Sequence, residues 1–158
     1  MRIGVLMGTF SRPTLEERFE AIKSCGLGCV QLNLGCAGVP SMPEAIPDAL
    51  ADRIRLSATA RGIAMVSVEG TFNMSHPDAE SRRQGLARLR VLAAACQRLG
   101  TPIIHLCTGT RDRDNMWRRH PDNDSPEAWR DMVGSMREAA VIAKQCNVVL
   151  AFEPEVNN

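Results

Sequence analysis

One pattern recurs along the 158-residue chain: a short apolar run, a polar stretch, and then an amphipathic segment with helical periodicity. The apolar runs predict five β-strands, and they lie at residues 3–7, 29–32, 63–68, 103–104 and 148–152. Each run is followed by side chains that can bind a ligand or transfer a proton. In parallel α/β proteins, ligands bind at the carboxyl ends of the strands. The pattern therefore predicts one shared site at one end of a parallel sheet.

The segments between the runs predict four helices, because each carries capping residues at its ends. Thr14 and Glu17 form a capping-box sequence, and Gly26, Gly62 and Gly100 stand where helices are expected to end. The predicted helical segments are residues 14–26, 47–61, 79–99 and 125–147. The last one is expected to bury one face, made of Trp129, Met132, Val133, Met136 and Ala140.

Two α/β architectures accommodate this order of elements. A doubly wound sheet of five strands would normally cover its last strand with a helix, and no helical segment follows residue 152. A (β/α)₈ TIM barrel takes about 250 residues, so five strands and four helices would be part of one. We therefore predict that residues 1–158 are the N-terminal part of a single barrel domain, truncated after strand five.

Charge and cysteine content narrow the class of protein. Nineteen basic and eighteen acidic residues nearly cancel, which argues against a dedicated nucleic-acid binder. Without a charged leader or a long apolar stretch, no membrane association is expected and the expected location is the cytoplasm. The six cysteines lack the spacing of a zinc or redox motif, so we expect buried thiols.

Four side chains at predicted strand ends are candidates for chemistry or binding. Glu153 follows an apolar strand, where a carboxylate can bind a divalent cation, act as a base, or simply meet solvent. His76 lies in a turn after the third strand, and it is either a loop residue or a ligand-binding one. His105 is either a packed strand residue or a ligand, and Glu69 needs a partner if it lies inside a barrel.

A seventeen-residue connection, residues 108–124, is longer than most structureless loops in compact domains. It alternates arginines with aspartates and carries Trp117 at its centre. One interpretation is a substrate lid with an anion-binding arginine, such as Arg111. The alternative is a solvated loop held by salt bridges.

Three motifs follow the third, fourth and fifth predicted strands: GTFNMSHPD at residues 70–78, HLCTGTR at 105–111 and FEPE at 152–155. With these motifs the chain resembles the sugar phosphate isomerase/epimerase family. That family consists of xylose isomerase-like TIM barrels and also includes endonuclease IV-type enzymes.

The resemblance implies a divalent metal ion, Mn²⁺, Mg²⁺, Co²⁺ or Zn²⁺, and a sugar, sugar phosphate or cyclitol as substrate. Glu153 matches the family's strand-five glutamate, which ligates the metal and exchanges a proton beside the substrate carbonyl. The metal would stabilise the resulting ene-diolate. The remaining ligands and a second acid/base are expected beyond residue 158. His76, His105, Glu69, Arg111 and Trp117 are the expected substrate contacts.

Two other functions remain open on the sequence. His76 and His105 match the approximate positions of zinc ligands in the endonuclease branch, although the balanced charge favours the isomerase branch. A non-catalytic half-barrel is the second alternative. Its first and last strands would be open edges, so we expect association into a homo-oligomer and little catalysis by the 158-residue chain alone.

Overall fold

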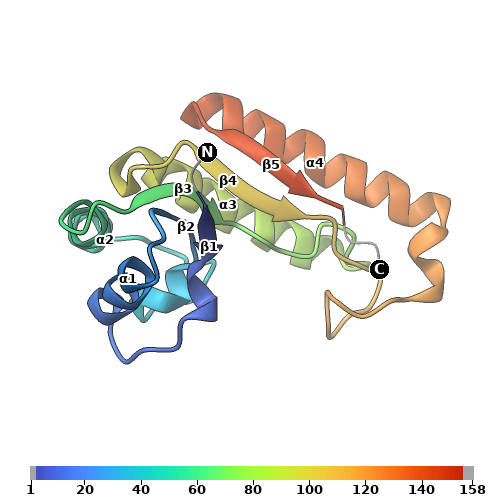
Figure 1. Cartoon of the computed structure of the whole chain (residues 1–158). Helices are drawn as coiled ribbons and strands as arrows, with labels where there is room; N and C mark the ends of the chain where they lie inside the picture. The colour runs from blue at the N-terminus through green and yellow to red at the C-terminus, as the bar shows by residue number, and fades with distance from the viewer. Residues whose placement is uncertain (1–2, 155–158) are drawn as a thin grey trace.

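The computed structural model describes residues 3–154 and contains one sheet of five parallel strands in the order β1-β2-β3-β4-β5 (Figure 1). The strands are β1 (Gly4–Leu6), β2 (Cys29–Leu32), β3 (Ala64–Glu69), β4 (Ile103–Cys107) and β5 (Val149–Glu153). The helices are α1 (Leu15–Ser24), α2 (Asp48–Thr59), α3 (Ala79–Leu99) and α4 (Pro126–Cys146). Short 3-10 turns follow the strands: η1 (Met7–Thr9), η2 (Leu34–Ala37) and η3 (Pro121–Asp124). Strand alternates with helix from β1 to β5, as predicted.

The strand order separates the two predicted architectures. A doubly wound sheet reverses its strand order and carries helices on both faces. Here each strand pairs with the next one along the chain, and all four helices join one core on the same side of the sheet. Figure 1 shows α3 passing behind β4 and α4 running alongside β5. The arrangement is that of successive units of a (β/α)₈ barrel, and the TIM-barrel prediction is confirmed.

The two faces of the sheet differ sharply in burial. Side chains such as Val30, Val68 and Ile104 point toward the helices and have no exposed surface. On the opposite face, Leu6 is 54% exposed and Val149 is 59% exposed. In a closed barrel this second face lines the interior, and ligands bind where it meets the carboxyl ends of the strands.

Capping residues set the helix ends where the sequence predicts them. In the first turn of α1, Thr14 Oγ1 accepts from the Glu17 amide while Glu17 Oε2 accepts from the Thr14 amide. At the start of α4, Ser125 Oγ accepts from the Ala128 amide. At the C-terminal ends, Gly100 and Asn147 adopt left-handed conformations with φ of 88° and 53°.

The predicted buried face of α4 is wrong in part. Trp129 is 66% exposed and Ala140 is also exposed, whereas Met132, Val133 and Met136 are only partly buried. The buried positions are Ala128, Ser135, Ala139, Ile142 and Ala143. These residues are mostly small, so α4 can approach its neighbours closely, and Ser135 Oγ donates a hydrogen bond to Met74 O at 3.0 Å. The helix is placed by small residues and not by its largest apolar ones.

The expectation of buried thiols holds for three of the six cysteines, Cys29, Cys96 and Cys107, which pack as small apolar groups. Cys36 and Cys146 are partly buried, and Cys25 is exposed, so for Cys25 the prediction is wrong. Within residues 3–154, no helix combines the length and the apolar character that crossing a membrane requires.

Candidate functional site

Four polar side chains line up across the interior-facing side of the sheet, and we call them the polar row: Asn33, Glu69, His105 and Glu153. The strand register explains their alignment. Glu69 pairs with His105, and Leu32 pairs with Val68, so that Asn33 and Glu69 follow side by side. Glu153 pairs with Cys107, two residues beyond His105 on the same face.

The polar row contains two close pairs. Asn33 Nδ2 donates a hydrogen bond to Glu69 Oε2 at 2.7 Å, and His105 Nε2 lies 2.9 Å from Glu153 Oε2. His105 is 20% exposed and Glu153 is 63% exposed. The structure therefore brings three of the predicted site residues, Glu69, His105 and Glu153, to one row.

Asn33 directly follows β2, and the sequence analysis assigned it no role. Its Oδ1 accepts from the Gly35 amide at 2.7 Å and from Ser41 Oγ at 3.0 Å. These two donors fix the orientation of the amide, so the Asn33 NH₂ group must face Glu69. The partner that the sequence analysis required for the Glu69 carboxylate is thus the side-chain amide of Asn33.

A second polar pair lies one step deeper on the same face and was missed. Ser67 Oγ donates to Gln31 Oε1 at 3.2 Å. Gln31 and Ser67 each stand two residues before a member of the polar row, inside otherwise apolar runs. Because side chains two apart in a strand share a face, this period-two spacing was the signal that could have identified them.

His76 lies in the loop after β3, and both of its ring nitrogens are engaged. Nδ1 accepts from the Asp78 amide at 3.0 Å, so Nε2 carries the proton and donates to Arg113 O at 3.2 Å. A histidine in this tautomer has no free lone pair for a metal ion. Its assignment as a substrate contact stays a prediction.

Arg111 joins loops instead of pointing at the polar row. Its Nη1 lies 2.7 Å from Asp131 Oδ2 and donates to Ser75 O at 3.0 Å, and its side chain is 14% exposed. Asp131 also accepts from Arg82 Nη2 at 3.1 Å, so two arginines share one carboxylate. Trp117, in the same loop, is 51% exposed. Substrate binding by Arg111 and Trp117 stays a prediction.

The loop between β4 and α4 is ordered by its own polar residues. Thr110 is fully buried, and its Oγ1 lies at hydrogen-bond distance from Arg118 O, at 2.8 Å. Asp112 accepts from the backbone amides of Asp114 and Asn115, and these hydrogen bonds hold the pKa of its carboxyl below the ordinary range. The ion pair between Arg118 and Asp112 fits the salt-bridged interpretation of the loop, and the substrate-lid interpretation stays a prediction.

The described residues do not complete a metal site. Within residues 3–154, no three His, Cys, Asp or Glu side chains come together in an arrangement that could hold an ion. The His105–Glu153 pair supplies one imidazole and one carboxylate, whereas Mg²⁺ demands six ligands and structural zinc sites take four. Further ligands would have to come from outside these residues.

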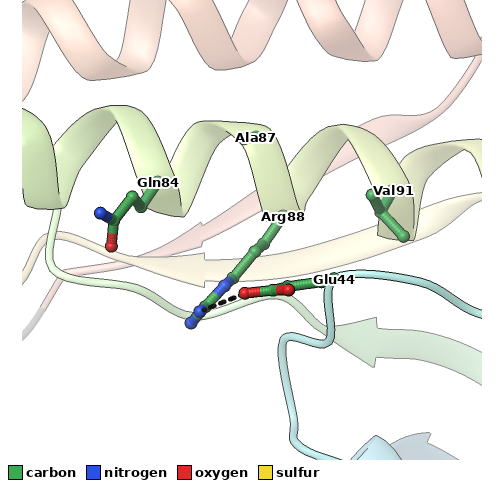
Figure 2. Close-up of a pocket in the computed structure, with 5 residues that line it drawn as sticks. All are labelled: Glu44, Gln84, Ala87, Arg88 and Val91. Atoms are coloured by element: carbon green, nitrogen blue, oxygen red, sulfur yellow. Dashed lines mark hydrogen bonds and ion pairs between the residues drawn. The ribbon is translucent and has the colours of Figure 1, made fainter.

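A cavity of about 350 Å³ lies away from the polar row, on the helical side of the molecule. Figure 2 shows Arg88 reaching from α3 toward Glu44 in the segment before α2, at 3.4 Å between Nη2 and Oε1. Gln84, Ala87 and Val91 complete its lining. None of the predicted site residues lines this cavity, so the cavity does not coincide with the candidate site.

The comparisons with known proteins agree with this geometry. A protein-family model described as a xylose isomerase-like TIM barrel matches residues 19–158. Among curated proteins the chain has no match. Among solved structures it is similar to the apo form of 3-keto-D-glucoside 4-epimerase YcjR from E. coli, with a TM-score of 0.73 and 18% identity over 98% of this chain and 56% of that one.

Two further structures share the fold. One is D-psicose 3-epimerase from Clostridium cellulolyticum H10 with D-tagatose, at a TM-score of 0.68 and 19% identity over 95% of this chain and 51% of that one. The other is a xylose isomerase-like TIM barrel protein from Mycobacterium smegmatis in complex with magnesium. Its TM-score is 0.65 and its sequence identity is 15%, over 96% of this chain and 54% of that one. The chain thus spans about half the length of these structures.

Proposed function

The chain belongs to the xylose isomerase-like TIM barrel family, and from this membership we propose that the barrel containing it is a sugar isomerase or epimerase. The reaction would move a proton at the carbon beside a substrate carbonyl and pass through an ene-diolate. The observation that carries the proposal is the His105–Glu153 pair at the carboxyl end of the sheet. Two sugar epimerases among the solved structures of the same fold support it. We also propose that residues 1–158 belong to one barrel domain.

Glu153 is the residue proposed to carry the proton. Its Oε2 lies 2.9 Å from His105 Nε2, while most of the side chain is exposed toward the barrel interior. In this proposal the other carboxylate oxygen faces the substrate carbon. A carboxylate fixed in this way meets the first requirement of a general base, which is position within reach of the proton. His105 is then a positioning residue for Glu153.

A divalent metal ion belongs to this proposal as a property of the complete barrel. Such an ion would polarise the substrate carbonyl and stabilise negative charge on its oxygen. The magnesium complex of a protein with the same fold supports its presence. Glu153 is the ligand that this chain would contribute, and the other ligands would lie outside the described residues.

The remaining predicted contacts are proposed to bind substrate hydroxyl or anionic groups. Glu69 lies next to His105 in the polar row, so it is the closest of them to the reacting group. His76, Arg111 and Trp117 stand on the loops after β3 and β4 and would contact a substrate only at the rim.

No observation favours the endonuclease alternative. That function needs zinc-binding histidines, and both ring nitrogens of His76 are engaged with backbone groups. The net charge of +1 also lacks the basic character of a nucleic-acid enzyme.

Exchange of substrate hydrogen for solvent deuterium tests the proposal. Complete barrels with Glu153→Gln and with Glu138→Gln would be incubated with ketoses and ketose phosphates in D₂O and followed by proton NMR. Loss of a general base lowers the rate by about 10²–10⁴-fold, so Glu153→Gln should show almost no exchange. Glu138 is exposed on α4, so its variant should match the wild type. Exchange by Glu153→Gln at the wild-type rate would show that the assignment is wrong.

A further inference from the structure

Arg18 is an exception among the arginines that the structure describes. Most of them form an ion pair with an aspartate or glutamate, as Arg53 does with Glu16. Apart from Arg18, the described arginines that form no ion pair are exposed: Arg12, Arg90, Arg113 and Arg137. Arg18 is partly buried and lacks a carboxylate partner within residues 3–154.

The guanidinium of Arg18 lies at the carboxyl end of β1. Its Nη1 donates to the carbonyl of Phe10, which directly follows the turn η1 at the end of that strand. Its Nε is buried and has no hydrogen-bond partner in the described part of the chain. One tether to a carbonyl therefore fixes the group, while a buried donor remains unused.

Cys36 links Arg18 to the polar row. Burial raises the pKa of the Cys36 thiol, the positive charge of Arg18 opposes this rise, and the negative charge of Glu69 adds to it. Both charges must be close to the thiol to act on it. The turn η2, which carries Cys36, contacts both η1 and α1. Arg18 thus stands at the β1–β2 end of the row, and Glu153 stands at the β5 end.

A partly buried cation without an anion is unfavourable, because removal from water is not compensated by a partner. A guanidinium presents its N–H groups as a fork that fits the two oxygens of a carboxylate or phosphate. The unused Nε donor and the missing counter-charge both indicate that an oxyanion belongs beside Arg18.

We propose that Arg18 is a specificity-determining residue that binds an oxyanion substituent of the substrate, either a phosphate ester or a carboxylate. The inference rests on the proposed function in one respect: the bound molecule would place its reacting carbon at Glu153 and its charged end at Arg18. Selection of an anionic over a neutral sugar would then reside at the β1 end of the site.

Binding of simple anions to the chain tests this proposal without any need for turnover. Inorganic phosphate and sodium acetate would be titrated separately at constant ionic strength, and the ¹⁵Nε–¹H signal of Arg18 followed by NMR. The variants are Arg18→Gln, Arg18→Lys and the control Arg12→Gln. Arg12 is exposed and, within residues 3–154, donates only to the carbonyl of its neighbour Ser11, so its variant removes the same charge from the same region.

We expect the Arg18 Nε signal to shift on saturation with at least one of the two anions, which also identifies the kind of substituent. Affinity for that anion should fall by about tenfold or more in Arg18→Gln, as expected for a lost hydrogen bond to a charged group. In Arg12→Gln it should change by less than about twofold, a small fraction of a kcal/mol. The Arg18→Lys variant, which keeps the charge but loses the fork, should lie between them.

A signal that moves with neither anion, or equal losses in Arg18→Gln and Arg12→Gln, would overturn the inference. The wild-type titration settles the point even if the Arg18→Gln chain does not fold. Failure of the proposed catalysis is distinguishable, because Glu153→Gln should bind the anion as the wild type does. Anion binding without deuterium exchange would thus reject the reaction and keep the role of Arg18.

Discussion

At the scale of single residues, Gly85 supports the loop that follows β3. It lies within α3, where a glycine usually costs about 1 kcal/mol relative to alanine. A Cβ at this position would overlap the ring of Phe72, which precedes the His76 loop. The close contact between helix and ring therefore requires the glycine.

Gly85→Ala should lower the free energy of unfolding by about 1–3 kcal/mol, because overpacking outweighs the gain in helix propensity. Gly134 in α4 is a matched control, since a Cβ there meets no atom within 4 Å. Gly134→Ala should raise stability by up to about 1 kcal/mol. Urea denaturation of both variants measures the change in the free energy of unfolding relative to the wild type. Stabilisation by both substitutions would contradict the proposed packing of Phe72.

The positions of the candidate site residues follow from the sequence, whereas their contacts do not. The positions of Glu69, His105 and Glu153 at strand ends could be predicted from the apolar runs. The pairing of His105 with Glu153 could not, because it depends on a register that sets Cys107 opposite Glu153. The ion pairs of Arg82 and Arg111 with Asp131 could not be predicted either, because the two arginines lie 49 and 20 residues away from it along the chain.

At the scale of elements, α1 and α2 are joined by a bidentate ion pair. Arg53 Nε donates to Glu16 Oε1 and Arg53 Nη2 donates to Glu16 Oε2, both at 2.9 Å. Ser57 Oγ donates to the same carboxylate. The hydrogen bond from Arg53 lowers the pKa of Glu16 from 4.5 to about 2. Because the pKa is depressed on folding, the stabilisation is present above pH 4.5 and is lost as the pH falls toward 2.

Glu16→Gln should lower the free energy of unfolding by up to about 1 kcal/mol at pH 7, since solvent screens a pair that is half exposed. The difference from the wild type should shrink as the pH is lowered. Glu20→Gln is the control on the same helix, because Glu20 is 60% exposed and its carboxylate contacts Arg61 through one oxygen. Chemical denaturation at pH 7, 4 and 2.5 gives the comparison. A loss of unfolding free energy in Glu16→Gln that stays the same at all three pH values would contradict the lowered pKa of Glu16.

Helix ends were more predictable than helix faces. Ends depend on local capping hydrogen bonds, such as that of Ser125 with the Ala128 amide, and these are encoded within a few residues. The buried face of α4 depends on which side approaches α3 and the loop after β3. Ser135 lies there against Met74 O, while Trp129 faces outward, and periodicity alone favoured the larger side chain.

At the scale of the whole molecule, the sheet has one face covered by helices and one face open. Leu6 and Val149 stand at opposite ends of the open face, each more than half exposed. In the described part of the chain, β1 and β5 each pair along one edge only. Exposed apolar strand surface and unpaired edges both favour association.

The isolated 158-residue chain should therefore self-associate, and the open face should be the surface that drives it. Replacing Leu6 and Val149 together by threonine places a β-branched side chain, which strands favour, at both positions and reduces the apolar surface, so association should weaken. Val141→Thr is the control, because Val141 is 54% exposed but lies on α4, away from this face. Sedimentation velocity over a range of concentrations would measure the effect. A chain that stays monomeric at every concentration, or one that Val141→Thr weakens equally, would show that the open face of the sheet is not what brings the copies together.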